Sequence, residues 1–267
     1  MICAKEETKM YSLKGKVVFI TGASSGIGRT CARSFATEGA KLLLGARRIE
    51  RIETLAMEIR EKYQVDVFPV KMDVTHYEEL EKTLSGLPQG WKEVEVLINN
   101  AGLSLRLDKV YDADVRDWDA MIDTNVKGLL YVTRLILPGM VERNRGHVIN
   151  IGSIAGLEVY PGGNVYCASK AAVRILSQGM RMDTFGKAIR VTNIQPGMTK
   201  TEFSLVRWKG DEALSDKIYE GVDYLRAEDV AEVILFCATR PPHVNIGDLV
   251  ITPVDQVSFT MVNRKSK

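Results

Sequence analysis

The length, composition and charge of the chain exclude several classes of protein. Its 267 residues, 45% of them hydrophobic, are enough for one large α/β unit or two smaller domains. The 36 Lys and Arg residues nearly balance the 34 Asp and Glu residues, so the net charge of +2 gives no reason to expect a nucleic acid partner. No apolar run approaches the roughly 18 to 20 residues that span a bilayer, so we expect no membrane segment.

The chain begins with a polar segment, residues 1–13, which lacks the apolar stretch of a secretory signal. We expect this segment to be a loose N-terminal extension. The cysteines, Cys3, Cys31, Cys167 and Cys237, are widely spaced and form no CxxC pair or cluster with histidines. We therefore expect neither a disulfide scaffold nor a metal site, and a cytoplasmic location.

From residue 14 onward, short apolar runs alternate with longer amphipathic stretches. The runs predict strands at residues 16–21, 41–44, 65–72, 94–99, 147–151, 189–194 and 248–251. The stretches predict helices near residues 27–38, 49–63, 77–85, 114–143, 164–185, 211–220 and 227–238. Several of the strands are apolar without alternation, which a sheet covered on both faces requires. The pattern predicts an α/β fold with a doubly wound parallel sheet.

No linker or repeat divides this pattern, so we expect residues 14–267 to form a single domain. The least regular stretch, residues 197–224, lies between the sixth strand and the late helices. We interpret it as a substrate-covering loop.

A glycine-rich turn follows the first predicted strand and precedes a helix. Its spacing is G-x-x-x-G-x-G, which is neither a P-loop nor the G-x-G-x-x-G pattern. Glycines let the backbone approach a pyrophosphate, which then rests on the N–H groups at the helix N-terminus. The alternative is an ordinary tight turn, but the strand before it and the helix after it favour a dinucleotide. We expect cofactor contacts from Gly22, Ser24, Ser25, Gly26, Ile27 and Gly28.

Two arginines, Arg47 and Arg48, follow the second predicted strand, where NAD-binding proteins place an acidic residue for the ribose 2′-hydroxyl. A carboxylate would repel a 2′-phosphate, whereas a guanidinium can bind it with two hydrogen bonds. The alternative is that both arginines only begin the charged face of the next helix. We expect NADP rather than NAD as the cofactor.

The third and fourth predicted strands also end in residues suited to a ligand. Asp73, followed by Val74, can accept a hydrogen bond from an adenine amino group, or can cap the next helix instead. Asn100, Ala101 and Gly102 offer an amide and a close backbone approach. Because ligands lie beyond the carboxyl ends of the strands in open α/β sheets, we expect all five residues to contact the cofactor.

The most specific pattern is Tyr166 followed four residues later by Lys170, with Ser153 upstream at the end of the fifth predicted strand. Residues four apart share a helix face. An ammonium group near a phenol lowers its pKa from about 10, which makes proton exchange near neutral pH easier. Tyr166 is thus a candidate general acid and base, and Ser153 can stabilise charge on the substrate oxygen. The alternative is a surface Tyr/Lys pair and a turn serine.

Taken together, these motifs resemble the short-chain dehydrogenase/reductase family. The resemblance covers about residues 14–255 and rests on six features: Thr21–Gly28, Asn99–Gly102, Asn125, Ser153, Tyr166 with Lys170, and Pro196–Gly197. It implies a seven-stranded parallel Rossmann sheet and hydride transfer to or from a nicotinamide.

The resemblance also implies roles for single residues. Tyr166 would exchange the proton, Ser153 would orient the carbonyl or alcohol, and Lys170 would bind the nicotinamide ribose and lower the pKa of Tyr166. Asn125 would help to hold a proton-relay water. Cofactor contacts would also come from Tyr166 and Lys170, and from a second group: Pro196, Gly197, Thr199 and Thr201.

Within the family, the chain resembles the NADP-dependent 3-hydroxy acid dehydrogenases, above all in residues 201–207. That group acts on serine, allo-threonine and related acids, so the site needs a partner for a carboxylate. Arg207 is our candidate for the substrate carboxylate, with Lys200 and Arg106 behind it. The alternative is that Arg207 is a solvated charge or lies in a subunit contact.

Other functions stay open on the sequence alone. One is a carbonyl reductase for ketones, sugars or steroids, and another is a protein that binds NADPH without turnover. The family also implies self-association as a homotetramer or dimer, through the two long helices near 114–143 and 164–185.

Overall fold

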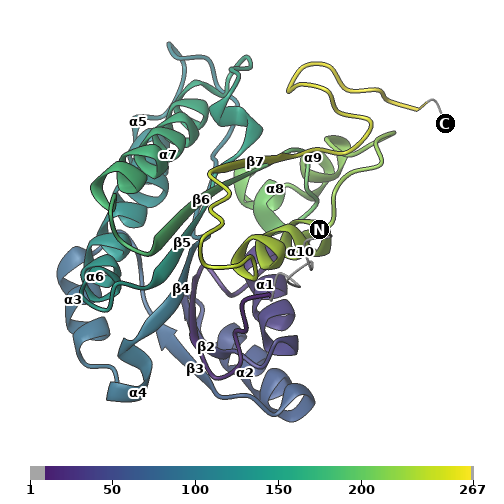
Figure 1. Ribbon diagram of the computed structural model, residues 1–267. Coiled ribbons are helices and arrows are strands. Elements are labelled where there is room, and N and C mark those ends of the chain that lie inside the picture. The colour runs from purple at the N-terminus through teal and green to yellow at the C-terminus, as the bar shows by residue number, and fades with distance from the viewer. Residues whose placement is uncertain (1–9, 266–267) are drawn as a thin grey trace, which may run out of the picture.

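A seven-stranded parallel sheet forms the centre of the protein. The computed structural model describes residues 10–265. The strands are β1 (Val17–Thr21), β2 (Lys41–Ala46), β3 (Val67–Lys71), β4 (Val94–Asn99), β5 (Gly146–Ile151), β6 (Ile189–Pro196) and β7 (Asp248–Ile251). Their order in the sheet is β3-β2-β1-β4-β5-β6-β7, with every neighbouring pair parallel (Figure 1). This confirms the predicted doubly wound α/β fold, and all seven strands overlap their predicted ranges.

Helices cover both faces of the sheet (Figure 1). One face carries α1 (Gly26–Thr37), α2 (Ile49–Tyr63) and α10 (Ala227–Ala238). The other carries α3 (Tyr77–Ser85), α6 (Leu129–Glu142) and α7 (Asn164–Asp183), with the short α4 (Gln89–Lys92) near its edge. Within residues 10–265, no helix is both long enough and apolar enough to cross a membrane.

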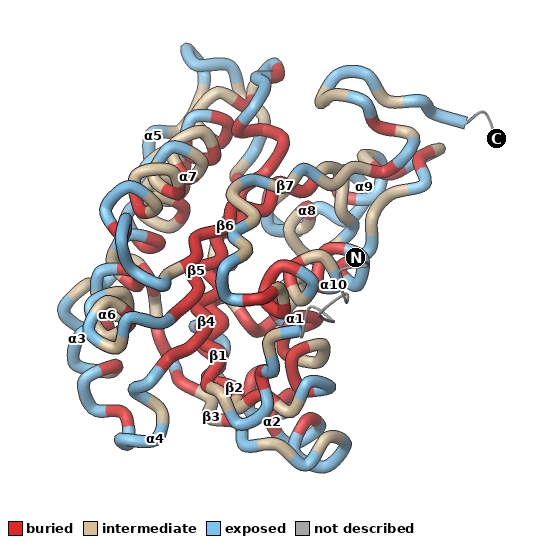
Figure 2. Tube along the Cα trace, viewed as in Figure 1, coloured by how far each residue is buried: buried red, intermediate tan, exposed pale blue. Residues whose placement is uncertain are grey.

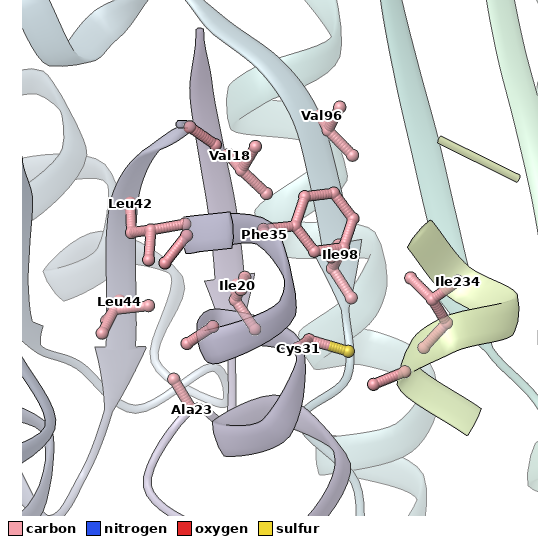
Figure 3. Close-up of a cluster of buried hydrophobic side chains, with 14 of the residues drawn as sticks. Val18, Ile20, Ala23, Cys31, Phe35, Leu42, Leu44, Val96, Ile98 and Ile234 are labelled. Atoms are coloured by element: carbon pink, nitrogen blue, oxygen red, sulfur yellow. The ribbon is translucent and has the colours of Figure 1, made fainter. Parts of the chain in front are cut away.

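The strands are apolar without alternation because both of their faces are buried. Val18 and Ile20 of β1 pack towards Phe35 of α1 and Ile234 of α10 in one cluster (Figure 3). Phe19, between them in the chain, belongs to the cluster on the opposite face. The central strands are accordingly the most continuously buried part of the trace (Figure 2).

The helix predicted over residues 114–143 is instead three segments. Helix α5 (Val115–Ile122) is followed by a π-helical turn, Asp123–Gly128, and then by α6. The π turn contains one residue more than an α turn would, and such turns are frequent at functional sites. Here it contains Asn125, which is 1% exposed. A 3.6-residue periodicity does not reveal one inserted residue, so the sequence prediction missed it.

Two further segments are more ordered than expected. The stretch 197–224 contains α8 (Glu202–Arg207), which the sequence did not predict, and α9 (Glu212–Lys217), which lies within the helix predicted near 211–220. The side chains of Thr201 and Asp211 cap them. At the N-terminus, the Tyr11 amide donates to the Thr239 carbonyl and Leu13 is fully buried, so the loose extension does not reach residue 13. The remainder of that expectation, residues 1–9, lies outside the described residues.

Candidate active site

The glycine-rich turn lies where the sheet order reverses, between β1 and β4. Gly22 has φ +66°, and a Cβ atom on it would lie 2.9 Å from the Ala101 Cα. A Cβ atom on Gly28 would lie 2.6 Å from the Gly22 carbonyl oxygen. The Asn100 side chain donates to the carbonyl of Thr21 at 2.9 Å. The turn is therefore packed directly on the end of β4, which only glycine permits at these two positions.

The N-terminus of α1 faces a cavity of about 500 Å³. The Ser25 side chain does not cap this helix, and its first turn contains no acidic residue. The first N–H groups and the positive end of the helix dipole thus suit an anionic group. Together with the close-packed glycines, this cradle fits the pyrophosphate of a dinucleotide.

Both predicted arginines line this cavity. Arg48 donates from Nη2 to the hydroxyls of Ser24 and Ser25, at 3.0 Å each. Arg47 lies 3.9 Å from the carboxylate of Asp73. Asp73 also accepts from the backbone N–H and the hydroxyl of Thr75 and so stabilises a local turn. It does not cap the next helix, because the N-cap of α3 is His76.

Ser153, Tyr166 and Lys170 converge at the carboxyl end of β5. Ser153 follows β5 and begins a 3₁₀ turn, Ile154–Gly156, whereas Tyr166 and Lys170 lie on α7. All three side chains are buried and line the cavity. Lys170 Nζ donates to the Ile151 carbonyl at 2.8 Å and lies 5.9 Å from the centre of the Tyr166 ring.

The charge environment of Tyr166 differs from the one expected. Burial raises the pKa of Tyr166 above its usual value, while Arg207 and Ser153 act to lower it. Burial lowers the pKa of Lys170 to about 8. Arg207 is the cation that opposes the effect of burial on Tyr166 here, and a lowering of the pKa of Tyr166 by Lys170 stays a prediction.

Asn125 links three segments of the chain by hydrogen bonds near Lys170. Its Nδ2 donates to the Leu103 carbonyl at 2.8 Å and to the Ser169 hydroxyl at 3.0 Å, and its Oδ1 accepts from the Leu103 N–H at 2.8 Å. A Cβ atom on Gly102 would lie 3.2 Å from Oδ1 and 3.5 Å from Lys170 Nζ. The amide therefore holds the chain after β4 against α7 beside the lysine.

Arg207 is the only one of the three carboxylate candidates that lines the cavity. It is 7% exposed, and it donates to Ser104 Oγ at 3.2 Å and to the Tyr160 hydroxyl at 3.4 Å. No described carboxylate lies within ion-pair distance of it. Lys200 instead pairs with Asp216 at 2.9 Å, and Arg106 lies outside the cavity.

Comparison with known proteins identifies the family. Residues 16–211, well over half of the chain, match the short chain dehydrogenase family. The chain belongs to this family. The resemblance read from its motifs is therefore confirmed, and the protein is a short-chain dehydrogenase/reductase.

The dehydrogenase also has close relatives. The NADP-dependent 3-hydroxy acid dehydrogenase of Salmonella typhi is 48% identical over 241 residues, which are 90% of this chain and 96% of the relative. Sulfoacetaldehyde reductase 2 of Chromohalobacter salexigens is 45% identical over 90% of this chain and 95% of its own. A solved structure, the closed form of serine dehydrogenase complexed with NADP+, has a TM-score of 0.87 at 44% identity. The match covers 94% of this chain and 100% of that one. These names agree with the expectation of NADP as the cofactor.

The dehydrogenase brings nearly all of its expected site residues to one cavity. Every expected cofactor, catalytic and substrate residue lines it except Gly28, which supports the turn, and Asn125, which lies behind Gly102.

The sequence prediction missed further residues that line the cavity, among them Phe203, Gln256, Phe259 and Arg264. The Phe259 ring stacks on that of Tyr160 with centroids 3.7 Å apart. No local pattern in the sequence places the irregular C-terminal segment over the site.

Proposed function

We propose that this short-chain dehydrogenase is an NADP-dependent enzyme that oxidises small 3-hydroxy acids at the 3-position. Serine, allo-threonine and 3-hydroxypropionate are its proposed substrate class. The observation that carries this proposal is the buried guanidinium of Arg207, which lies beside Tyr166 without a carboxylate partner among the described residues.

A buried cation is costly unless an anion compensates it. Among residues 10–265, the Arg207 guanidinium has only the neutral hydroxyls of Ser104 and Tyr160 as hydrogen-bond partners, at 3.2 and 3.4 Å. Its guanidinium carbon lies 5.4 Å from the Tyr166 ring centre. A short molecule with a carboxylate at one end and a hydroxyl nearby can reach both groups at once, whereas a plain alcohol leaves the cation uncompensated.

The cofactor cradle suits NADP. The glycine turn and the N-terminus of α1 would hold the pyrophosphate, and Arg47 and Arg48 would hold the 2′-phosphate. The chemistry that NADP supplies when bound is the acceptance of a hydride from the carbon that bears the hydroxyl.

The proton is handled by the residues of the chain itself. Tyr166 would take the proton of the substrate hydroxyl during oxidation and return one during reduction. Ser153, whose hydroxyl is buried next to the cavity, would hold the substrate oxygen. Lys170 would bind the nicotinamide ribose, and Asn125 would hold the proton-relay water in its neighbourhood.

The anion that Arg207 binds can also be a sulfonate. A guanidinium pairs with either oxyanion, and one relative at 45% identity is named sulfoacetaldehyde reductase 2. Sulfoacetaldehyde therefore belongs among the substrates to be tested.

We also infer a cytoplasmic homotetramer or dimer. Helix α7 exposes Ile175 and Met182, which are 55% and 77% exposed, and Phe185 just beyond it is 92% exposed. Apolar side chains exposed along one of the two long helices suit packing against a second subunit. Sedimentation velocity of the purified protein measures the number of subunits.

A spectrophotometric panel tests the proposed function. NADP+ reduction is followed with serine, allo-threonine, 3-hydroxypropionate and simple secondary alcohols, and NADPH oxidation with sulfoacetaldehyde. The Tyr166→Phe variant is the control and should lose turnover by at least about 100-fold. Activity on the secondary alcohols alone would favour a carbonyl reductase, and full activity of Tyr166→Phe would refute the mechanism.

A further inference from the structure

A carboxylate on α8 connects the substrate side of the cavity to the arginines on its cofactor side. Glu202, the first residue of α8, accepts a hydrogen bond from Arg48 Nη1 at 3.0 Å and from Arg51 Nη1 at 2.7 Å. Arg48 is the N-cap of α2 and Arg51 lies near its start. The contacts thus join segments 154 and 151 residues apart in the chain.

Arg48 divides its donors between two sides. Its Nε and Nη2 donate to the hydroxyls of Ser24 and Ser25 in the glycine turn, whereas its Nη1 donates to Glu202. One edge of the guanidinium therefore faces the turn where phosphates are expected. The N–H groups of this edge are taken by the serine hydroxyls, which a phosphate would replace as acceptors, while Glu202 keeps its hydrogen bond from Nη1.

The far end of the same helix carries Arg207. Helix α8 has only six residues, fewer than two turns, so its two ends move as one short body. The carbonyl of Arg207 also accepts from the Arg106 N–H at 2.9 Å. A displacement of Glu202 would therefore displace the guanidinium that lies beside Tyr166.

The ion pairs of Glu202 with Arg48 and Arg51, called the network below, position these side chains more than they stabilise the fold. The side chains of Arg48, Arg51 and Glu202 are 43%, 48% and 36% exposed, and ion pairs this exposed contribute little to folding. Partial burial raises the pKa of Glu202, but the hydrogen bonds from both arginines outweigh it and lower that pKa. The carboxylate is therefore ionised at neutral pH.

We propose that Glu202 is a positioning residue that couples the cofactor site to the substrate site. It holds Arg48 towards the 2′-phosphate and fixes α8, so that Arg207 stands beside Tyr166 when the phosphate end of the cofactor is bound. This inference rests on the proposed function, which supplies the roles of Arg48 and Arg207.

The test compares Glu202→Gln with the matched control Glu212→Gln in the full-length protein. Glu212 is exposed on α9 and takes part in none of the ion pairs among the described residues. Glu202→Gln should weaken NADPH binding roughly two- to tenfold in a fluorescence titration, change NADH binding less, and raise the KM for 3-hydroxypropionate with kcat nearly kept. The control should do none of these.

A double-mutant cycle separates coupling from a general structural effect. Arg51→Gln removes one of the two arginine contacts of Glu202 and leaves the contact with Arg48, so it should weaken NADPH binding less than Glu202→Gln does. The double variant should be no weaker than Glu202→Gln alone, because that variant already loses the Arg51 contact. Thermal unfolding of the variants should stay close to that of the unaltered protein.

Two results would overturn the proposal. Tighter NADPH binding by Glu202→Gln would show that the carboxylate competes with the 2′-phosphate, and unchanged NADPH binding and KM would show that the network has no role. If the unaltered protein oxidises no 3-hydroxy acid, the proposed function fails, but the NADPH titrations still decide whether Glu202 positions Arg48.

Discussion

The guanidinium carbon of Arg207 lies 5.4 Å from the centre of the Tyr166 ring. Arg207 is buried and has no carboxylate partner among residues 10–265. One cation can therefore act twice: it attracts an anionic substrate, and it stabilises the phenolate of Tyr166 against the effect of burial. The consequences for binding and for pH dependence can be measured separately.

The pH profile tests the second effect. Oxidation requires the deprotonated phenol, and Arg207 lowers the pKa of Tyr166, so Arg207→Gln should move the rising limb of kcat/KM for oxidation to higher pH. An uncharged alcohol is the appropriate substrate, because its binding does not depend on the cation. Arg207→Lys keeps the charge and should keep most of the profile, and an unmoved limb in Arg207→Gln would contradict this role.

Cofactor preference depends on Arg47. Arg47→Asp places a carboxylate where a 2′-phosphate is expected, so we predict that it weakens NADPH binding roughly 10- to 100-fold. NADH, which has no 2′-phosphate, serves as the control within the same variant and should bind about as before or better. Equal affinity of the unaltered protein for both cofactors would argue against the assignment, as would unchanged NADPH binding by the variant.

A side chain in the glycine turn should destabilise the folded protein. A Cβ atom on Gly28 would lie 2.6 Å from the Gly22 carbonyl oxygen, and that backbone atom cannot yield easily. Gly28→Ala should therefore lower the free energy of unfolding by about 1 to 3 kcal/mol, measured by urea denaturation. Gly179→Ala on α7 is the control, because a Cβ atom there would meet nothing within 4 Å. A neutral Gly28→Ala would mean that the turn is looser than described.

The lowered pKa of Lys170 should make the stability of the protein depend on pH. Its pKa is lowered by burial from 10.5 to about 8, so between these values the unfolded chain binds more protons than the folded protein. Stability from this residue therefore rises as the pH increases from about 8 towards 10.5, by at most about 3 kcal/mol.

The Lys170→Met variant isolates this contribution. Several buried tyrosines and cysteines have raised pKa values and act in the opposite direction, so only the difference between the variant and the unaltered protein is informative. The advantage of Lys170→Met in free energy of unfolding should be largest near pH 7 and shrink by pH 10. A difference independent of pH would contradict a buried, depressed lysine.

The sequence predicts the sheet well, because strands buried on both faces leave an apolar signature that does not depend on distant contacts. It predicts the glycine turn, Ser153, Tyr166 and Lys170 for a similar reason, since each stands at a strand end or on one helix face. The π turn around Asn125 and the six-residue helix α8 are too short for periodicity to reveal.

The substrate side depends on tertiary packing. In the sequence, nothing distinguishes the three cations Arg207, Lys200 and Arg106. Only the packing of α8 buries Arg207, whereas Lys200 pairs with Asp216 at the surface. The stacking of Phe259 on Tyr160 likewise depends on the course of an irregular segment. The net pKa of Tyr166 follows from burial, which a spacing of four residues does not report.

The most direct test of the account compares 3-hydroxypropionate with its methyl ester in the unaltered protein and in Arg207→Gln. Both compounds carry the same reacting hydroxyl, and only the acid carries a charge. We predict that the unaltered protein has a higher kcat/KM for the acid than for the ester and that Arg207→Gln loses this preference. The kcat/KM of the variant should fall by roughly 10- to 100-fold for the acid and little for the ester. An equal loss on both compounds, or no loss on the acid, would contradict the account.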